Sequence, residues 1–191
     1  MKKIAIALVC MIMGLGAANA QGNFTFGPKV GFDLTNFWGK DVKHGMQANY
    51  QAGMFFEYRF NNGFAIAPEV VFASQGGKGK VEGVKYTYTT NYINVPVMLK
   101  YYVIPQLSID FGPQIGFNVY SKQTTQVGEV KVKEDYKDVT NTVDFGLGLG
   151  ATYNLSTNAF VQARYTMGMT KVFKASSAKN GNIQIAFGYR F

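Results

Sequence analysis

Hydrophobic and polar residues alternate along several segments of this chain, and the last segment, residues 182–191, shows the pattern best. Isoleucine, phenylalanine and tyrosine occupy every second position from Ile183 to Phe191, while glutamine, alanine, glycine and arginine lie between them. Successive side chains of a β-strand point to opposite faces, so this segment has one continuous apolar face. The same period of two predicts eight strands in all. They span residues 24–35, 48–60, 64–73, 92–102, 107–119, 139–153, 160–169 and 182–191.

The connections between these segments predict how the strands assemble. They alternate between long and short along the chain, as in an outer-membrane barrel with large outer loops and short periplasmic turns. We therefore expect an all-β fold, an eight-stranded antiparallel up-and-down transmembrane β-barrel whose apolar face contacts lipid and whose two termini are periplasmic. A soluble barrel of the lipocalin type is disfavoured, because an eight-stranded interior has no room for dozens of large apolar side chains.

The first 20 residues have the features of a secretory signal peptide. Two lysines precede an apolar run, residues 4–16, and the small-x-small sequence at residues 18–20 fits a cleavage site directly after it. The alternative, a membrane anchor, needs a longer apolar run of about 20 residues. We expect a signal peptide over residues 1–20, followed by one barrel domain over residues 21–191 in the outer membrane of a Gram-negative-type cell.

The predicted polar face carries ten charged residues, five cations and five anions. A buried charge without a partner is costly, so we expect these side chains to form salt bridges that plug the lumen. Lys100 and Asp110 lie opposite each other if their hairpin turns at Pro105, and this pair is the firmest of the set. The predicted lumen network comprises Lys29, Asp33, Glu57, Arg59, Glu69, Lys100, Asp110, Asp144, Arg164 and Arg190.

Lysine is the only strong cation in the predicted outer loops, where twelve lysines face six acidic residues. One hypothesis is that these lysines contact the phosphates of an anionic outer leaflet that includes lipopolysaccharide, each contributing about 1 kcal/mol. The alternative is that the charge only keeps the loops soluble. The predicted lipid-contact residues are Lys78, Lys80, Lys85, Lys131, Lys133, Lys171 and Lys174.

Few residues are candidates for catalysis or cofactor binding. The only histidine is His44, and a lipid-deacylating barrel would need it beside Ser74 and an orienting acid. The glycines of residues 146–150 lack the third glycine of a dinucleotide-binding loop, and no helix pattern follows them. One histidine and a cysteine confined to the signal segment give no basis for a metal site. Secretion and loop lysines without stacking aromatics disfavour nucleic acid as a partner. We expect no enzymatic activity and no cofactor.

Four segments resemble the PorT-type outer-membrane β-barrel proteins, small barrels of the OmpX kind. They are residues 26–37 (FGPKVGFDLTNF), 92–102 (YINVPVMLKYY), 146–172 (GLGLGATYNL to ARYTMGMTKV) and 187–191 (FGYRF). The resemblance implies an integral barrel inserted by the barrel-assembly machinery, which reads the terminal strand and Phe191. Some members are said to assist protein export across the envelope. We therefore expect a structural or surface-interaction protein, with an export accessory and a lipid A-modifying enzyme as the alternatives.

Overall fold

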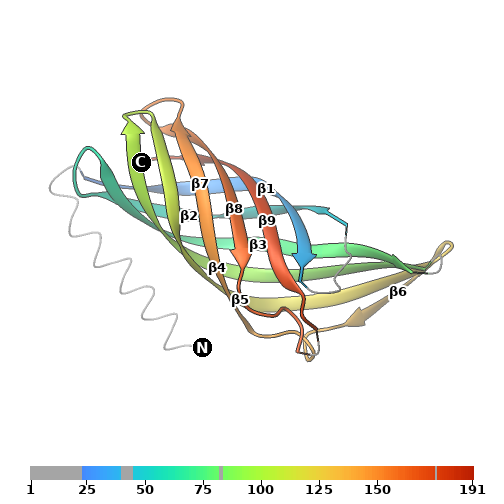
Figure 1. The fold of residues 1–191 in the computed structure, drawn as a ribbon. Coiled ribbons are helices and arrows are strands. Elements are labelled where there is room, and N and C mark those ends of the chain that lie inside the picture. Colours follow the sequence, from blue (N-terminus) through green and yellow to red (C-terminus); the bar gives the residue numbers. More distant parts are fainter. Residues whose placement is uncertain (1–22, 40–44, 82–83, 175) are drawn as a thin grey trace.

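The computed structural model describes residues 23–39, 45–81, 84–174 and 176–191, and these form nine β-strands (Figure 1). The predicted signal peptide lies outside the described residues. None of the described residues belongs to a helix long and apolar enough to span a membrane. The strands are β1 (Phe24–Trp38), β2 (Gln47–Arg59), β3 (Phe64–Val81), β4 (Val84–Ile104), β5 (Leu107–Val127), β6 (Val130–Asp135), β7 (Val143–Asn154), β8 (Ala159–Gly168) and β9 (Lys179–Tyr189).

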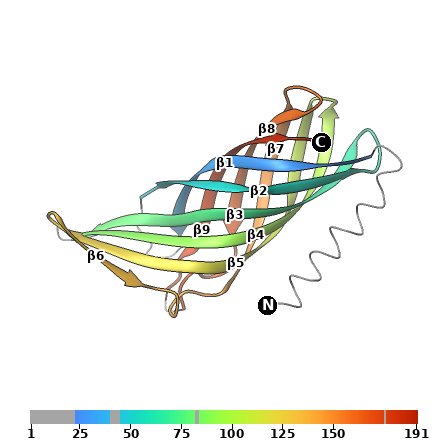
Figure 2. The same cartoon turned by 180° about the vertical axis from the view of Figure 1, so that it is seen from behind.

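Eight of these strands form a closed antiparallel ring. Each strand from β1 to β4 pairs with the next one along the chain, and β5 also pairs with β7. β7 then pairs with β8, and β8 with β9. Pairing of β9 with β1 closes the barrel, which Figure 2 shows from behind. The remaining strand, β6, pairs with β5 outside the ring. The predicted eight-stranded antiparallel barrel is therefore confirmed.

The two faces of the barrel wall differ as the alternation predicted. Phe32 and Ile185 lie on the outer surface with 78% and 63% of their area exposed. Glu69 and Arg164 lie inside, each 3% exposed. An outer surface of aromatic and branched aliphatic side chains is stable only against an apolar medium, as in a membrane barrel.

The two ends of the barrel are built differently. At one end lie the short turns and both ends of the described chain, Asn23 and Phe191 (Figure 1). The β2–β3 turn there is closed by the Asn61 side chain, whose Oδ1 accepts hydrogen bonds from the Gly63 and Phe64 amides at 2.8 and 2.9 Å. We call this the turn end, and the opposite end, which carries the longer connections, the hairpin end.

Two segments predicted as loops are in fact strands. β3 and β4 remain paired up to Val81 and Val84, and β5 continues to Val127 before β6 folds back on it. These hairpins project from one side of the barrel as a sheet made of β3, β4, β5 and β6 (Figure 1). β4 and β5 each have 21 residues against 10 in β8, and at about 3.3 Å per residue this difference is roughly 36 Å.

Aromatic side chains pack against one another inside the barrel at two levels. Phe55 and Phe160 meet edge to face inside the wall with ring centroids 4.9 Å apart. Towards the hairpin end, Phe37, Tyr88 and Phe173 form an aromatic cluster whose centroids lie 5.5 to 6.3 Å apart. Phe37 lies beyond the predicted end of the first strand at residue 35, but it is buried in this cluster because β1 continues past it.

Candidate functional site

A first ionic cluster in the lumen is centred on Glu69 of β3. Lys29 of β1 bonds its Oε2 at 2.5 Å, and Arg164 of β8 donates to both oxygens at 3.1 and 2.6 Å. Lys29 also donates to Gln162 Oε1 at 3.0 Å. The three charged side chains are almost fully buried. This cluster ties together three strands that are not neighbours in the ring, and it does so across the barrel interior.

A second cluster, nearer the turn end, is centred on Glu57 of β2. Its Oε2 lies 3.0 Å from Lys100 Nζ and 3.8 Å from Arg190 Nη2. Its Oε1 accepts hydrogen bonds from Arg59 Nε at 3.1 Å and from the Tyr102 hydroxyl at 2.6 Å. Three cations therefore surround one carboxylate, which leaves an excess of two positive charges among the groups that contact it.

The predicted pair between Lys100 and Asp110 does not form. Strand register places the two residues opposite each other, but the Lys100 ammonium turns across the lumen to Glu57. Asp110 instead accepts hydrogen bonds from Ser108 at 2.6 Å, Thr152 at 2.5 Å and Gln162 at 3.2 Å.

The other two predicted lumen aspartates also bond to neutral donors. Asp33 accepts from Gln51 at 2.8 Å, and Asp144 accepts from Thr170 at 2.5 Å and Asn180 at 2.7 Å. Of the five acidic residues in the predicted network, all of them described, only the two glutamates form salt bridges. The physical reason is reach, because glutamate extends one carbon further than aspartate toward the axis, where side chains of distant strands meet.

Lysines gather on one face of the projecting sheet. Directly opposed residues on neighbouring strands share a face. One such row runs from Lys85 of β4 through Gln126 of β5 to Lys131 of β6. The next row towards the barrel runs from Lys78 of β3 through Thr87 and Thr124 to Lys133. We call this surface the lysine face. Its lysines with described side chains are Lys78, Lys85, Lys122, Lys131 and Lys133, and Asp135 lies opposite Lys122 on the same face.

The lysine face continues the apolar outer surface of the barrel. On β5 the outward positions run from Ile115 through Val119 and Tyr120, which are all exposed, to Lys122. The Lys122 ammonium lies 5.9 Å from the centre of the Tyr120 ring. The opposite face of the sheet carries Tyr88, which packs into the aromatic cluster over the lumen. Lys122 therefore stands directly beyond the apolar belt, and the other lysines lie on the same outward face, one and two rows farther from the barrel.

The remaining predicted lysines occupy other positions at the hairpin end. Lys171 and Lys174 are exposed between β8 and β9, and Lys174 Nζ donates to the Asp138 carbonyl at 2.7 Å. The Lys80 backbone belongs to β3, but its side chain lies outside the described part. Phe191, at the turn end, is 66% exposed, and its amide donates to the Phe26 carbonyl at 2.9 Å.

A model of the outer membrane protein beta-barrel domain matches residues 18–174, most of the sequence. The chain belongs to this family. Among solved structures, this outer-membrane barrel is similar to the attachment invasion locus protein Ail of Yersinia pestis, with 14% identity and a TM-score of 0.52 over 87% of this chain and 98% of Ail. Neisserial surface protein A (NspA) gives 12% identity and a TM-score of 0.51, over 88% and 97%. A comparison with curated proteins finds no match.

The residues considered for catalysis are not brought together in the described part of this outer-membrane barrel. His44 lies outside the described residues. Ser74 is only 4% exposed. Within residues 23–39, 45–81, 84–174 and 176–191, no group of histidine, cysteine, aspartate and glutamate side chains is arranged to hold a metal ion. The distinctive chemistry of the described structure is the ionic lumen and the lysine face.

Proposed function

We propose that this outer-membrane barrel is a non-enzymatic structural and surface-interaction protein whose lysine face binds the phosphate groups of lipopolysaccharide in the outer leaflet. The proposal places the hairpin end outside the cell and both termini in the periplasm. The observation that carries it is the position of the lysines. They continue the same outward face as the apolar belt, with Lys122 directly beyond Tyr120 and the others in the next two rows.

Headgroup depth explains the change in composition along that face. Below Tyr120 the outward side chains of β5 are apolar, and beyond it they are Lys122, Thr124 and Gln126. Aromatic side chains favour the membrane–water boundary, and lysines just outside it reach anionic headgroups. Charge that serves only solubility needs no such alignment, and both faces of the sheet would satisfy it.

A polyanion complex is known for one barrel of the same fold. Ail of Yersinia pestis, with a TM-score of 0.54 and 15% identity to this chain, has a crystal structure in complex with the heparin analogue sucrose octasulfate. The likeness is one of fold alone, so it supports the architecture and not a shared ligand. The proposal of a phosphate-bearing ligand rests on the lysine face of this chain.

The test compares barrel stability in two bilayers. Folded protein is placed in bilayers with intact lipopolysaccharide or with its dephosphorylated form, and the free energy of unfolding is measured in each. At about 1 kcal/mol per lysine, Lys78→Gln, Lys85→Gln, Lys131→Gln and Lys133→Gln together remove at most about 4 kcal/mol of the phosphate-dependent stabilisation. The phosphate-dependent stabilisation of the wild type should also decrease as ionic strength rises.

A charge-preserving variant provides the matched control. The same four lysines changed to arginine keep the positive charge on the lysine face, so phosphate-dependent stabilisation should persist. Equal stability of the wild type in both bilayers would refute the proposal, because charge that serves only loop solubility does not distinguish them. Loss of stabilisation in the arginine variant would also count against an electrostatic contact.

The two alternatives lack a comparable observation. An export accessory of the PorT type rests on the sequence resemblance, and no described cluster of side chains adds to it. A lipid A-modifying enzyme requires His44, which is outside the described residues, and an accessible Ser74, which is buried. Insertion by the barrel-assembly machinery through the terminal strand and Phe191 is retained as part of the proposal.

A further inference from the structure

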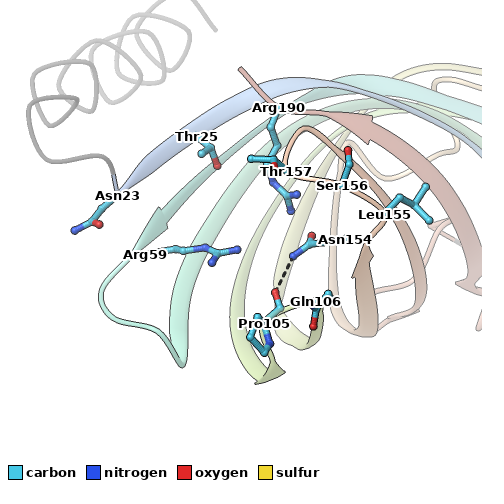
Figure 3. A pocket seen from close by; sticks show the side chains of 10 residues that line it. All are labelled: Asn23, Thr25, Arg59, Pro105, Gln106, Asn154, Leu155, Ser156, Thr157 and Arg190. Carbon is cyan, nitrogen blue, oxygen red and sulfur yellow. Dashed lines mark hydrogen bonds between the residues drawn. The ribbon is translucent and has the colours of Figure 1, made fainter.

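A cavity of about 510 Å³ opens at the turn end, the end of the barrel opposite the projecting sheet. Arg59 from the end of β2 and Arg190 after β9 point into it from different sides, as Figure 3 shows. The other residues that line the cavity are uncharged. These lining residues are Asn23, Thr25, Pro105, Gln106, Asn154, Leu155, Ser156 and Thr157.

Both guanidinium groups are held in place by aromatic rings. Arg59 Cζ lies 4.1 Å from the centre of the Tyr102 ring, and Arg190 Cζ lies 4.6 Å from the centre of the Phe160 ring. Stacking of this kind fixes the plane of a guanidinium, so less entropy is lost when it binds an anion. The cavity therefore presents two preorganised cationic groups.

Two buried hydrogen-bond donors of Arg190 have no partner in the described structure. The Arg190 side chain is 6% exposed, yet its Nε and Nη2 atoms have no hydrogen-bond partner, and Nη2 approaches Glu57 only to 3.8 Å. Arg59 uses Nε for Glu57, and 38% of its side chain is exposed at the cavity. Buried polar groups are nearly always hydrogen-bonded, so the free donors of Arg190 point to a ligand.

We infer that this cavity binds a soluble anion carrying a phosphate group. The two arginines that line the cavity share one carboxylate, Glu57, so positive charge is in excess there, and a phosphate anion would counter it. A tetrahedral phosphate presents oxygens in more than one plane and can face two guanidinium groups that approach from different sides, whereas a carboxylate has two oxygens in one plane. The hydroxyl and amide groups of the rim supply further donors. The ring of strands separates the cavity from surrounding lipid, which favours a soluble source over a lipid headgroup.

The test is a titration of the full folded chain in dodecyl maltoside, a phosphate-free detergent. Inorganic phosphate and glycerol 3-phosphate are added separately, with succinate as the carboxylate comparison, while backbone amide signals are followed by NMR. Saturable shifts are expected at Asn154, Ser156 and Arg190, with both phosphates binding more tightly than succinate. Loss of the Arg59 guanidinium in Arg59→Gln should weaken phosphate binding about tenfold or more.

Further variants separate binding from folding. Thr157→Glu adds a carboxylate at the exposed rim without touching Glu57, and it should abolish binding while the barrel keeps its electrophoretic shift on heating. Lys174→Gln, at the hairpin end, removes a cation of equal charge and should bind phosphate like the wild type.

Three outcomes would overturn the inference. The first is the absence of saturable shifts with either phosphate. The second is equal affinity in Arg59→Gln and wild type, or tighter binding of succinate. The third is the same shifts in phosphatidylglycerol nanodiscs without soluble phosphate, which would assign the site to a lipid headgroup. None of these results depends on the lysine face, so this inference and the proposed function stand or fall separately.

Discussion

Replacement of Glu69 by glutamine tests whether the lumen is held together by its buried charges. The carboxylate is the shared partner of Lys29 and Arg164, both almost fully buried, and it accepts three charge-assisted hydrogen bonds of 2.5 to 3.1 Å. Breaking a buried pair by removing one partner costs about 3–5 kcal/mol, because the remaining charge stays uncompensated. Glutamine keeps one acceptor oxygen, so we expect a loss near the lower end, about 3 kcal/mol.

The measurement is equilibrium unfolding by urea in lipid vesicles, followed by fluorescence of Trp38, the single tryptophan. Glu134→Gln serves as the control because Glu134 is exposed on β6, and a surface change of this kind should stay within about 0.5 kcal/mol. A second variant, Glu69→Gln with Lys29→Met, removes one of the two cations left without a partner. It should recover part of the lost free energy of unfolding. A loss below about 1 kcal/mol for Glu69→Gln would refute the reasoning, since it would mean that the lumen accommodates two unpaired cations.

Three further predictions follow from the packing of the wall and lumen. Gly27→Ala should destabilise the barrel by about 1–3 kcal/mol in the same urea assay, because its Cβ would lie 1.7 Å from the Tyr189 carbonyl oxygen, whereas Gly63→Ala, with 3.6 Å to its nearest neighbour, should be near neutral. Phe160→Ala should cost about 3–5 kcal/mol by loss of the buried contact with Phe55. Planar bilayers containing the wild type should show no steady ion current, and a stable open conductance would contradict a lumen closed by side chains.

Much of the fold could be predicted from the sequence because the two-residue alternation of apolar and polar side chains runs through every strand of the wall. A transmembrane wall forces apolar residues outward at every second position, so alternation reveals both the strands and their faces. Beyond the membrane that constraint ends, and the outer hairpins were expected to be loops. A weaker signal was present there, since residues 85–90 (KYTYTT) and 130–135 (VKVKED) also alternate and contain residues that favour strands.

The contacts inside the lumen were less predictable. Register places Lys100 opposite Asp110, but long side chains reach across the axis, and the ammonium bonds Glu57 of β2 instead. A linear sequence specifies neighbours along and between strands, whereas meetings across the lumen depend on the tilt and stagger of the closed barrel. The cavity with Arg59 and Arg190 was missed for the same reason, although both arginines were expected to face inward.

A single bulge links the barrel wall to the lysine face. On β5, Asn118 pairs with Tyr92 and Tyr120 pairs with Asn91, so Val119 is an extra residue and the parity of β5 changes there. If β5 kept all its residues and paired regularly with β4, Lys122 would point into the lumen. A further cation there would lack a partner and would be costly to bury. With the bulge, Lys122 points outward and joins the lysines of β3, β4 and β6 on one face. Bulges re-aim side chains in this way at the rims of barrels, and here the re-aiming adds Lys122 to the charge that lies just beyond the apolar belt. Deletion of Val119 should remove the extra residue, let Asn118 and Tyr120 pair regularly with Tyr92 and Asn91, and leave Lys122 pointing outward. The barrel should then keep its heat-dependent electrophoretic shift, and loss of that shift would contradict this account of the bulge.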